Sequence, residues 1–236
     1  MNTVIRSNGR GADALIELKR FNGPEKISQT LMEKLARVGI ESFGKGMKAP
    51  EVRQHVRESD TIFVAFKNNG VAGFACSVYL LSQFGKELYL SGSAVREADQ
   101  GNGVYRMLTE ARIDLGIELG ARAIATRTQN PRIEKVVSEV INAKIIDGTV
   151  MLGDQKAKRQ RATGFTVVRD QMPGVYGRRL TADVPLCGDS RLDSSYAELD
   201  YNRGDAFMLT FVLAPAASKQ AKRGDKGSRA PPMAYA

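Results

Sequence analysis

Hydrophobic and polar positions in the first sixty residues predict one strand followed by two helices. Residues 14–21 (ALIELKRF) have the composition of a strand, and Pro24 suits a first helical turn. The apolar residues that follow recur at helical spacing: Ile27, Leu31, Leu35 and Val38. Gly39 and Gly44 are expected to break this helix, and residues 50–58 predict a second, shorter one.

The clearest pattern is a β-hairpin. Residues 61–67 (TIFVAFK) and 71–81 (VAGFACSVYLL) are rich in β-branched and aromatic residues. The dipeptide Asn69-Gly70 between them tolerates the positive φ of a tight turn. Residues 86–95 (KELYLSGSAV) predict a further strand.

The rest of the chain alternates helices and strands. It predicts a helix over residues 104–119, a strand over 123–128, a helix opened by Pro131, and late strands over 165–169 and 206–213. An antiparallel hairpin between helices and such an alternation favours an α+β fold. We expect a mixed, mostly antiparallel twisted sheet with helices on its faces.

The composition indicates one globular domain with a basic tail. The 236 residues are 42% hydrophobic and 26% charged, which excludes wholesale disorder. We expect a single domain over residues 1–215. The net charge of +9 is concentrated in residues 216–236 and in the run QKAKRQR (155–161), and the tail is expected to be disordered. Neither segment interleaves aromatic residues with its charges, so a nucleic-acid partner is only a minor alternative.

The small numbers of cysteines and histidines and the lack of a long apolar stretch exclude several classes of protein. Two cysteines and one histidine make neither a disulfide framework nor a Cys/His zinc site, so no metal is expected. Residues 207–217, the most apolar stretch, are about half the length that spans a bilayer. We therefore expect a cytoplasmic protein that does not enter membranes. Cys76 is expected in the core, and His55 as a solvated or capping residue.

The segment that carries chemistry is AVREADQGNGVYRML, residues 94–108. A strand ends there, a glycine-containing loop follows, and a helix begins at once. Glycines expose main-chain N–H groups, and the first helical turn leaves its N–H donors unpaired at the positive end of the helix dipole. Such a place binds a phosphate or pyrophosphate without any basic side chain.

Two nucleotide-binding classes do not fit this segment. A P-loop needs Lys and Ser or Thr after its last glycine, where the chain has Val104 and Tyr105. A dinucleotide fingerprint needs a third glycine, where the chain has Arg106.

The segment resembles motif A of the GNAT acetyltransferase superfamily, whose pattern is Gln or Arg, two residues, Gly, one residue, then Gly or Ala. Gln100 and Gly103 match this pattern, whereas Tyr105 replaces the small final residue. The hairpin before the motif, the strand and Asn130 after it, and the following helix and strand keep the family's order. The resemblance covers roughly residues 61–169 and implies a GNAT-like acyl-CoA N-acyltransferase fold.

The resemblance implies acetyl-CoA as co-substrate, with its pantetheine arm lying between two parted strands. The main chain of Ala94, Val95 and Arg96 is expected to pair with the arm, and Asn130 to contact it from the second strand. Arg132 or the loop of residues 156–161 is a candidate for the 3′-phosphate, with a solvated role as the alternative. The expected pyrophosphate-binding residues are Gln100, Gly101, Asn102, Gly103, Val104 and Tyr105.

The resemblance also implies direct attack of an amine on the thioester. A carboxylate or an ordered water then accepts the amine's proton, a strand amide near Val95 stabilises the oxyanion, and a tyrosine meets the thiolate. Counting back by two from Val95 places Ser93, Ser91, Tyr89 and Glu87 on one inward face. Glu87 is the candidate base, with Ser91 positioning a water. The helix after Asn130 lacks the family's tyrosine, which leaves Tyr176 and Tyr201 as candidates by default.

The leading hypothesis is an N-acetyltransferase that moves the acetyl group of acetyl-CoA to a primary amine on a small molecule or protein. An acyltransferase using a longer acyl-CoA is one alternative. Another is an inactive GNAT-like module that binds an acidic or nucleic-acid partner through residues 156–161. Residues 145–163 and 171–203 exceed the minimal fold and are expected to shape the acceptor site or an oligomer contact, such as a homodimer.

Overall fold

The computed structural model describes residues 4–8, 15–44, 47–152, 160–181 and 183–215. The strands are β1 (Val4–Asn8), β2 (Leu15–Asn22), β3 (Thr61–Lys67), β4 (Gly70–Ser82), β5 (Gly85–Val95), β6 (Ala123–Thr128), β7 (Met151–Leu152), β8 (Gln160–Met172) and β9 (Ala206–Pro215). The helices are α1 (Gln29–Phe43), α2 (Ala49–Arg57), α3 (Val104–Glu118), α4 (Pro131–Asp147) and α5 (Ser190–Tyr196), with 3-10 turns η1 (Pro24–Lys26) and η3 (Glu97–Asp99).

These strands form a nine-stranded sheet in the order β1-β2-β3-β4-β5-β6-β9-β8-β7. Within the described ranges, neighbouring strands are antiparallel except for β5 and β6, which are parallel. Helix α3 makes the crossover that a parallel pair requires. The expected α+β fold with a mixed, mostly antiparallel sheet is confirmed.

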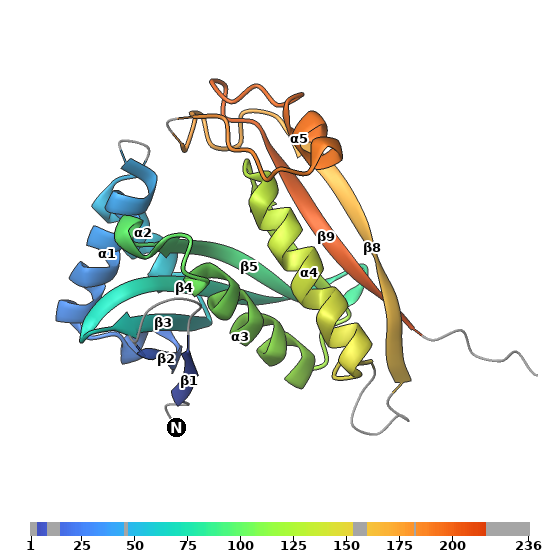
Figure 1. Cartoon of the computed structure of the whole chain (residues 1–236), viewed down its shortest axis with the longest axis horizontal. Coiled ribbons are helices and arrows are strands. Elements are labelled where there is room, and N and C mark those ends of the chain that lie inside the picture. The colour runs from blue at the N-terminus through green and yellow to red at the C-terminus, as the bar shows by residue number, and fades with distance from the viewer. Residues whose placement is uncertain (1–3, 9–14, 45–46, 153–159, 182, 216–236) are drawn as a thin grey trace, which may run out of the picture.

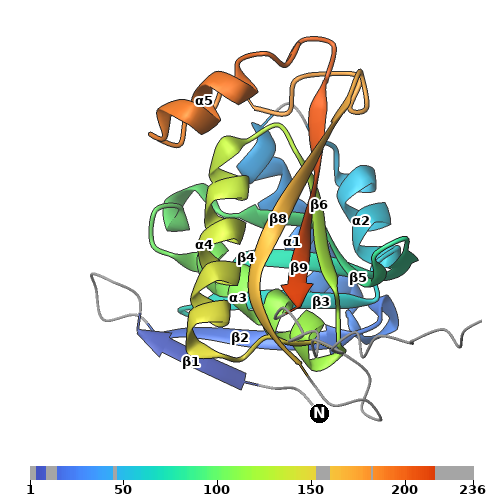
Figure 2. The same ribbon diagram turned by 90° about the vertical axis from the view of Figure 1, so that its right-hand side faces the viewer.

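Helices cover both faces of the sheet. On one face, Leu35 of α1, Val56 of α2 and Val64 of β3 are buried in the same core. On the other face α3 and α4 pack against the sheet through Leu108 and Val140. Figure 2 shows α4 and α2 on opposite sides of the sheet. Cys76 is buried in the first of these cores, and burial raises the pKa of its thiol to about 11.

The hairpin turn and the end of the first helix differ from the sequence-based expectations. The hairpin turn is Asn68-Asn69, with φ of 50° and 62°, because Gly70 already pairs with Lys67 in the β3–β4 ladder. Gly39 does not break α1. A Cβ there would lie 2.7 Å from Val52 Cγ2, so the glycine lets α2 approach α1 closely.

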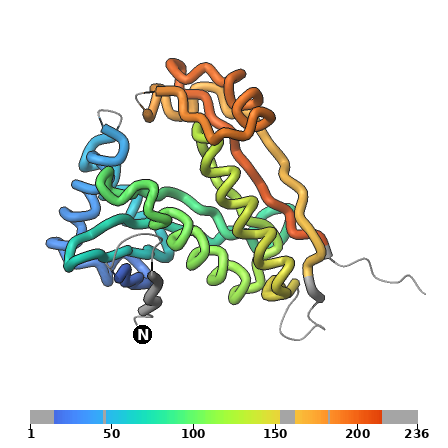
Figure 3. The backbone as a smooth tube through the Cα atoms, in the orientation of Figure 1, coloured from blue at the N-terminus to red at the C-terminus, as the bar shows by residue number. Residues whose placement is uncertain are grey.

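Other elements lie beyond the predicted set. Strands β1 and β7 and helix α5 were not anticipated, and α5 belongs to the connection between β8 and β9. Figure 3 shows this connection at the end of the molecule where α4 begins. The expected disordered tail and most of the basic run 155–161 lie outside the described residues. No helix in the described ranges is long and apolar enough to cross a membrane.

Candidate active site

Strands β5 and β6 run side by side only at their beginnings. Their parallel pairs are Glu87 with Ala123, Leu88 with Ile124 and Tyr89 with Ala125. Farther along, β5 stays paired with β4 and β6 stays paired with β9. The two strands therefore separate toward their C-terminal ends, as Figure 1 shows. We call residues 90–95 of β5 and 126–128 of β6 the parted strands.

The pairing of β5 with β4 determines which main-chain groups of β5 point toward β6. The Arg96 N–H donates to the Ala72 carbonyl of β4 at 2.8 Å. Since main-chain groups of successive residues point to opposite sides of a strand, those of Ser93 and Val95 point toward β6. Gln100 Nε2 donates to the Val95 carbonyl at 3.1 Å.

This direction corrects part of the expected cofactor contact. Ala94 pairs with Phe74 of β4, and the Arg96 carbonyl accepts from Asp99 N–H at 2.8 Å. The main chain of Ala94 and Arg96 is therefore already used within the fold. Of the three expected strand residues, Val95 is the one whose main chain faces the gap, together with Ser93.

The loop after β5 ends in an unblocked helix N-terminus. Gly101 and Gly103 have φ of 76° and 78°, a region that favours glycine. The first hydrogen bond of α3 runs from Met107 N–H to the Gly103 carbonyl at 3.0 Å. Among the described residues, nothing accepts from the amide N–H groups of residues 101–106. A Cβ on either glycine would meet no atom within 4 Å, so the space beside both glycines is open.

Buried ion pairs hold this loop in place. Asp99 is 2% exposed, and its carboxylate pairs with Arg96 at 2.5 Å and with Lys67 of β3 at 3.2 Å. The Arg96 side chain thus fixes the loop that the amide groups depend on.

Tyr105 does not fill the space beside the glycines. Burial raises the pKa of the Tyr105 hydroxyl. The nearby Arg112, Thr109 and Ser93 act in the opposite direction and lower it. These neighbours place the Tyr105 hydroxyl between α3 and β5. The departure from the motif at this position therefore leaves the helix N-terminus open.

A β-bulge in β5 lies where the two strands part. Strand β4 pairs Cys76 with Gly92 and Val78 with Tyr89, so β5 has one extra residue between these pairs. A bulge reverses the alternation of side chains beyond it.

The bulge overturns the predicted inward face. Leu88 contacts α3 at Gly116, and Val95 also packs toward α3, although the two residues are seven positions apart and would lie on opposite faces of an unbroken strand. Tyr89 and Glu87 therefore lie on the opposite face of the sheet from Ser93 and Val95. A count by two assumes an unbroken ladder, which this strand does not have.

Glu87 is not brought to the parted strands. It pairs with Ala123 at the closed end of β5 and β6, about 25 Å along the strand from Val95. The expectation that Glu87 accepts a proton there is not supported by its position. Ser91 lies at the bulge, where its Oγ is buried and without a hydrogen-bond partner among the described residues.

Four side chains gather at the parted strands on the face that α2 covers. We call them the His55 cluster: His55 of α2, Tyr89 of β5, Arg127 of β6 and Tyr176 of the β8–β9 connection. Tyr176 donates its hydroxyl hydrogen to the Arg127 carbonyl at 3.1 Å, and Arg127 Cζ lies 4.8 Å from the Tyr176 ring centre. Burial raises the pKa of Tyr89 and of Tyr176, so both hydroxyls stay protonated.

His55 lies against the main chain of β5. A Cβ on Gly92 would be 2.3 Å from His55 Nε2, and this atom is buried without a partner in the described structure. The expectation of a solvated or capping histidine is therefore wrong. One signal was available, since His55 adjoins the buried positions Val52 and Val56 on a short helix.

The β8–β9 connection reaches across to α2. Arg178 Nη2 donates to both carboxylate oxygens of Glu51 in α2, at 3.0 and 2.8 Å. The connection is also tied to β6, because Leu180 N–H donates to Gln129 Oε1 at 3.1 Å. It thus covers the side of the parted strands where Tyr176 lies.

Asn130 lies at the end of β6, as expected, and caps α4. Its Oδ1 accepts from Arg132 N–H at 3.0 Å, while its own N–H donates to Thr128 Oγ1 at 2.9 Å. The cap uses only Oδ1, so the Nδ2 donors of Asn130 take no part in it. The Arg132 Nε donates to the Leu186 carbonyl at 2.5 Å, which ties α4 to the connection.

Asp205 anchors the connection that carries Tyr176. It is fully buried and accepts from Gly174 N–H at 2.8 Å and from Arg203 at 2.6 Å. The Arg203 hydrogen bonds hold the pKa of Asp205 well below its usual value.

We expect Asp205→Asn to melt at a lower temperature than the wild type at pH 7. Because the folded pKa is depressed, the stabilisation is complete above the unfolded pKa of about 3.9 and is lost as pH falls toward the folded value. The difference in Tm should therefore shrink below about pH 4. A difference that stays constant between pH 7 and pH 3 would contradict this role.

The arrangement defines a class of protein. A mixed sheet whose two central parallel strands part beside an open helix N-terminus is the GNAT-like fold. Residues 28–136, a little under half of the chain, match the model of the Acetyltransferase (GNAT) family. This match confirms the resemblance to the GNAT acetyltransferase family carried by Gln100 and Gly103.

The chain is also similar to solved structures of acetyltransferases. The ribosomal-protein-S18-alanine N-acetyltransferase from Escherichia coli is 12% identical, with a TM-score of 0.50 over 86% of this chain and 97% of that chain. The NatC complex bound to Gag peptide and CoA is 14% identical, with a TM-score of 0.49 over 84% of this chain and 99% of that chain. No curated protein matches the sequence.

Proposed function

We propose that this chain binds acetyl-CoA between β5 and β6 and transfers its acetyl group to a primary amine by direct attack. One observation carries the proposal: the strands pair at three positions and then part beside an unblocked helix N-terminus. Family members are typically acetyl-CoA-dependent N-acetyltransferases, which supports it further.

The cofactor would be held mostly by main chain. The N–H groups of residues 101–106 would bind the pyrophosphate at the positive end of α3. Ser93 and Val95 would hydrogen-bond the pantetheine arm along the free edge of β5, with Asn130 facing them from the end of β6. No charged side chain is needed for this grip.

The chemistry needs an oxyanion donor and an acid for the thiolate. A fixed strand N–H at Ser93 or Val95 would stabilise the oxyanion of the tetrahedral intermediate. Tyr176 lies at the parted strands with a protonated hydroxyl, which suits it to protonate the leaving thiolate. The acceptor would enter on the face covered by α2 and the β8–β9 connection.

Ligand-dependent melting tests the proposal. A ligand present at about 100 times its Kd stabilises the folded state by about 2.7 kcal/mol. We expect CoA and acetyl-CoA to raise Tm by several degrees. NAD, which has a diphosphate but no pantetheine arm, should leave Tm unchanged. The absence of a shift with either CoA compound would refute the proposal.

Measuring the release of CoA thiol distinguishes acetyl transfer from the two alternative functions. Acetyl-CoA is offered with peptide N-termini, polyamines and aminoglycosides, and free CoA is measured. Release with an amine supports acetyl transfer. Faster release from longer acyl-CoA esters would identify a different acyl donor, and CoA binding without release from any ester would indicate a binding module.

A further inference from the structure

The proposed transfer requires a group that accepts a proton from the amine. Only a neutral amine has the lone pair that attacks the thioester. In the His55 cluster both tyrosine hydroxyls are protonated and Arg127 is a cation, so neither residue type accepts a proton at neutral pH. The nearby carboxylate of Glu51 is engaged by Arg178. The imidazole of His55 is the remaining base of the cluster.

The position of His55 suits this task. Its Nε2 is buried, has no hydrogen-bond partner among the described residues, and lies against Gly92. Gly92 immediately precedes Ser93, whose main chain faces the gap between the parted strands. The imidazole therefore lies one residue from the place where the thioester would be bound, on the face from which the amine would approach.

We propose that His55 is the catalytic base, accepting the proton of the acceptor amine at Nε2; this rests on the proposed acetyl transfer. The amine nitrogen forms a bond to the thioester carbon, the C–S bond breaks, and the N–H proton moves to Nε2. Tyr176 gives its proton to the CoA thiolate. Exchange with water then restores the neutral imidazole and the phenol, so the products are an amide and CoA thiol.

The electrostatic surroundings keep His55 neutral near pH 7. Burial lowers its pKa, and Arg127 of β6 lowers it further. A hydrogen bond of the imidazole with the Ser91 main chain of β5 and the charge of Glu58 of α2 act in the opposite direction. Tyr89 and Tyr176, which also lie beside Arg127, carry no charge. The charge of Arg127 also favours the neutral form of a bound amine.

Replacing the base tests the assignment. General base catalysis contributes about 10²–10⁴-fold, so we expect His55→Gln to lower kcat/KM at least about 100-fold at pH 7. The Tm shift with CoA should be unchanged, and the fall in kcat/KM toward acid pH that protonation of the imidazole causes in the wild type should disappear. Activity within threefold of the wild type, with the same pH profile, would overturn the role.

A glycine pair gives a second test with a matched control. The Cβ of Gly92→Ala would displace the His55 ring, whereas Gly164→Ala in β8 meets no atom within 4 Å. We expect Gly92→Ala to lower kcat/KM with CoA binding retained, and Gly164→Ala to leave both unchanged. Equal kcat/KM in the two variants would contradict the contact.

The single histidine allows a test that needs no acceptor. Its imidazole ¹⁵N and ¹³C signals should shift when acetyl-CoA binds, because the thioester would lie beside the ring. Acetyl-CoA that raises Tm without moving these signals overturns the role of His55 and leaves cofactor binding intact. Acetyl-CoA that does not bind at all overturns both this assignment and the proposed function.

Discussion

Gly103→Glu is expected to weaken CoA binding at least about 100-fold, which is about 2.7 kcal/mol. Gly103 has φ of 78° and precedes the first residue of α3, with no atom near the position of its missing Cβ. A glutamate would occupy the space proposed for the pyrophosphate. Its carboxylate would also compete for the same N–H donors and repel the phosphates.

Gly188→Glu is the matched control for this variant. Gly188 has φ of 75°, and a Cβ there also meets no atom within 4 Å, but it lies in the β8–β9 connection. Both changes carry the same backbone strain of about 1–2 kcal/mol. Calorimetric titration with CoA compares their Kd values. Wild-type affinity in Gly103→Glu would exclude this loop as the pyrophosphate site.

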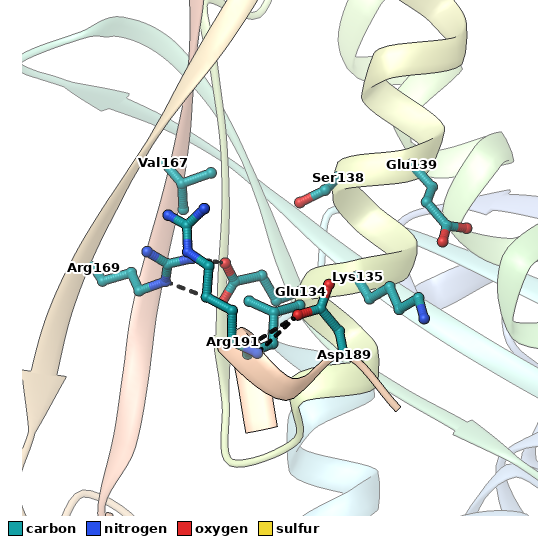
Figure 4. A pocket seen from close by; sticks show the side chains of 9 residues that line it. Glu134, Lys135, Ser138, Glu139, Val167, Arg169, Asp189 and Arg191 are labelled. Carbon is teal, nitrogen blue, oxygen red and sulfur yellow. Dashed lines mark hydrogen bonds and ion pairs between the residues drawn. The ribbon is translucent and has the colours of Figure 1, made fainter. Parts of the chain in front are cut away.

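Glu134→Gln is expected to destabilise the fold by about 3 kcal/mol, because a buried carboxylate loses its charge beside a cation. Glu134 of α4 is 2% exposed, pairs with Arg169 of β8, and accepts from the Tyr196 hydroxyl at 3.2 Å. It thereby joins α4, β8 and α5. Figure 4 shows Glu134 and Arg169 among the side chains that line a pocket. Its volume is about 330 Å³, and Arg191 and Leu192 of α5 also line it.

An exposed ion pair provides the comparison. Glu110→Gln breaks a pair with Arg106 in which both side chains are about two-fifths exposed. Such pairs are worth about 0.5 kcal/mol. In urea unfolding at pH 7, Glu134→Gln should lose much more free energy of unfolding than Glu110→Gln. A loss below about 1 kcal/mol for Glu134→Gln would mean that Arg169 finds adequate solvation without it.

Local patterns in the sequence were enough to predict most of the fold. Strands β3 and β6 have the predicted bounds, because alternation and β-branched residues are read within a few positions. The glycine loop before α3 could likewise be recognised from adjacent residues. Helix α5 has seven residues, too few for a helical period to stand out.

The site chemistry depended on contacts that are distant in sequence. The bulge in β5 arises from its pairing with β4, so a count along one strand placed Glu87 and Tyr89 on the wrong face. His55 becomes a candidate base only because Gly92 admits its ring. No local pattern in α2 indicates which strand it covers, so the sequence alone did not place His55 beside β5.

The proposed base and the proposed acid belong to parts of the chain that an ion pair joins. His55 is on α2 and Tyr176 on the β8–β9 connection, and Glu51 and Arg178 link the two with side chains about 40% exposed. An exposed pair of this kind is worth less than about 1 kcal/mol, so thermal motion breaks and remakes it readily. Under the proposed function, loosening this surface contact would let α2 and the connection separate locally, while the buried sheet beneath stays intact.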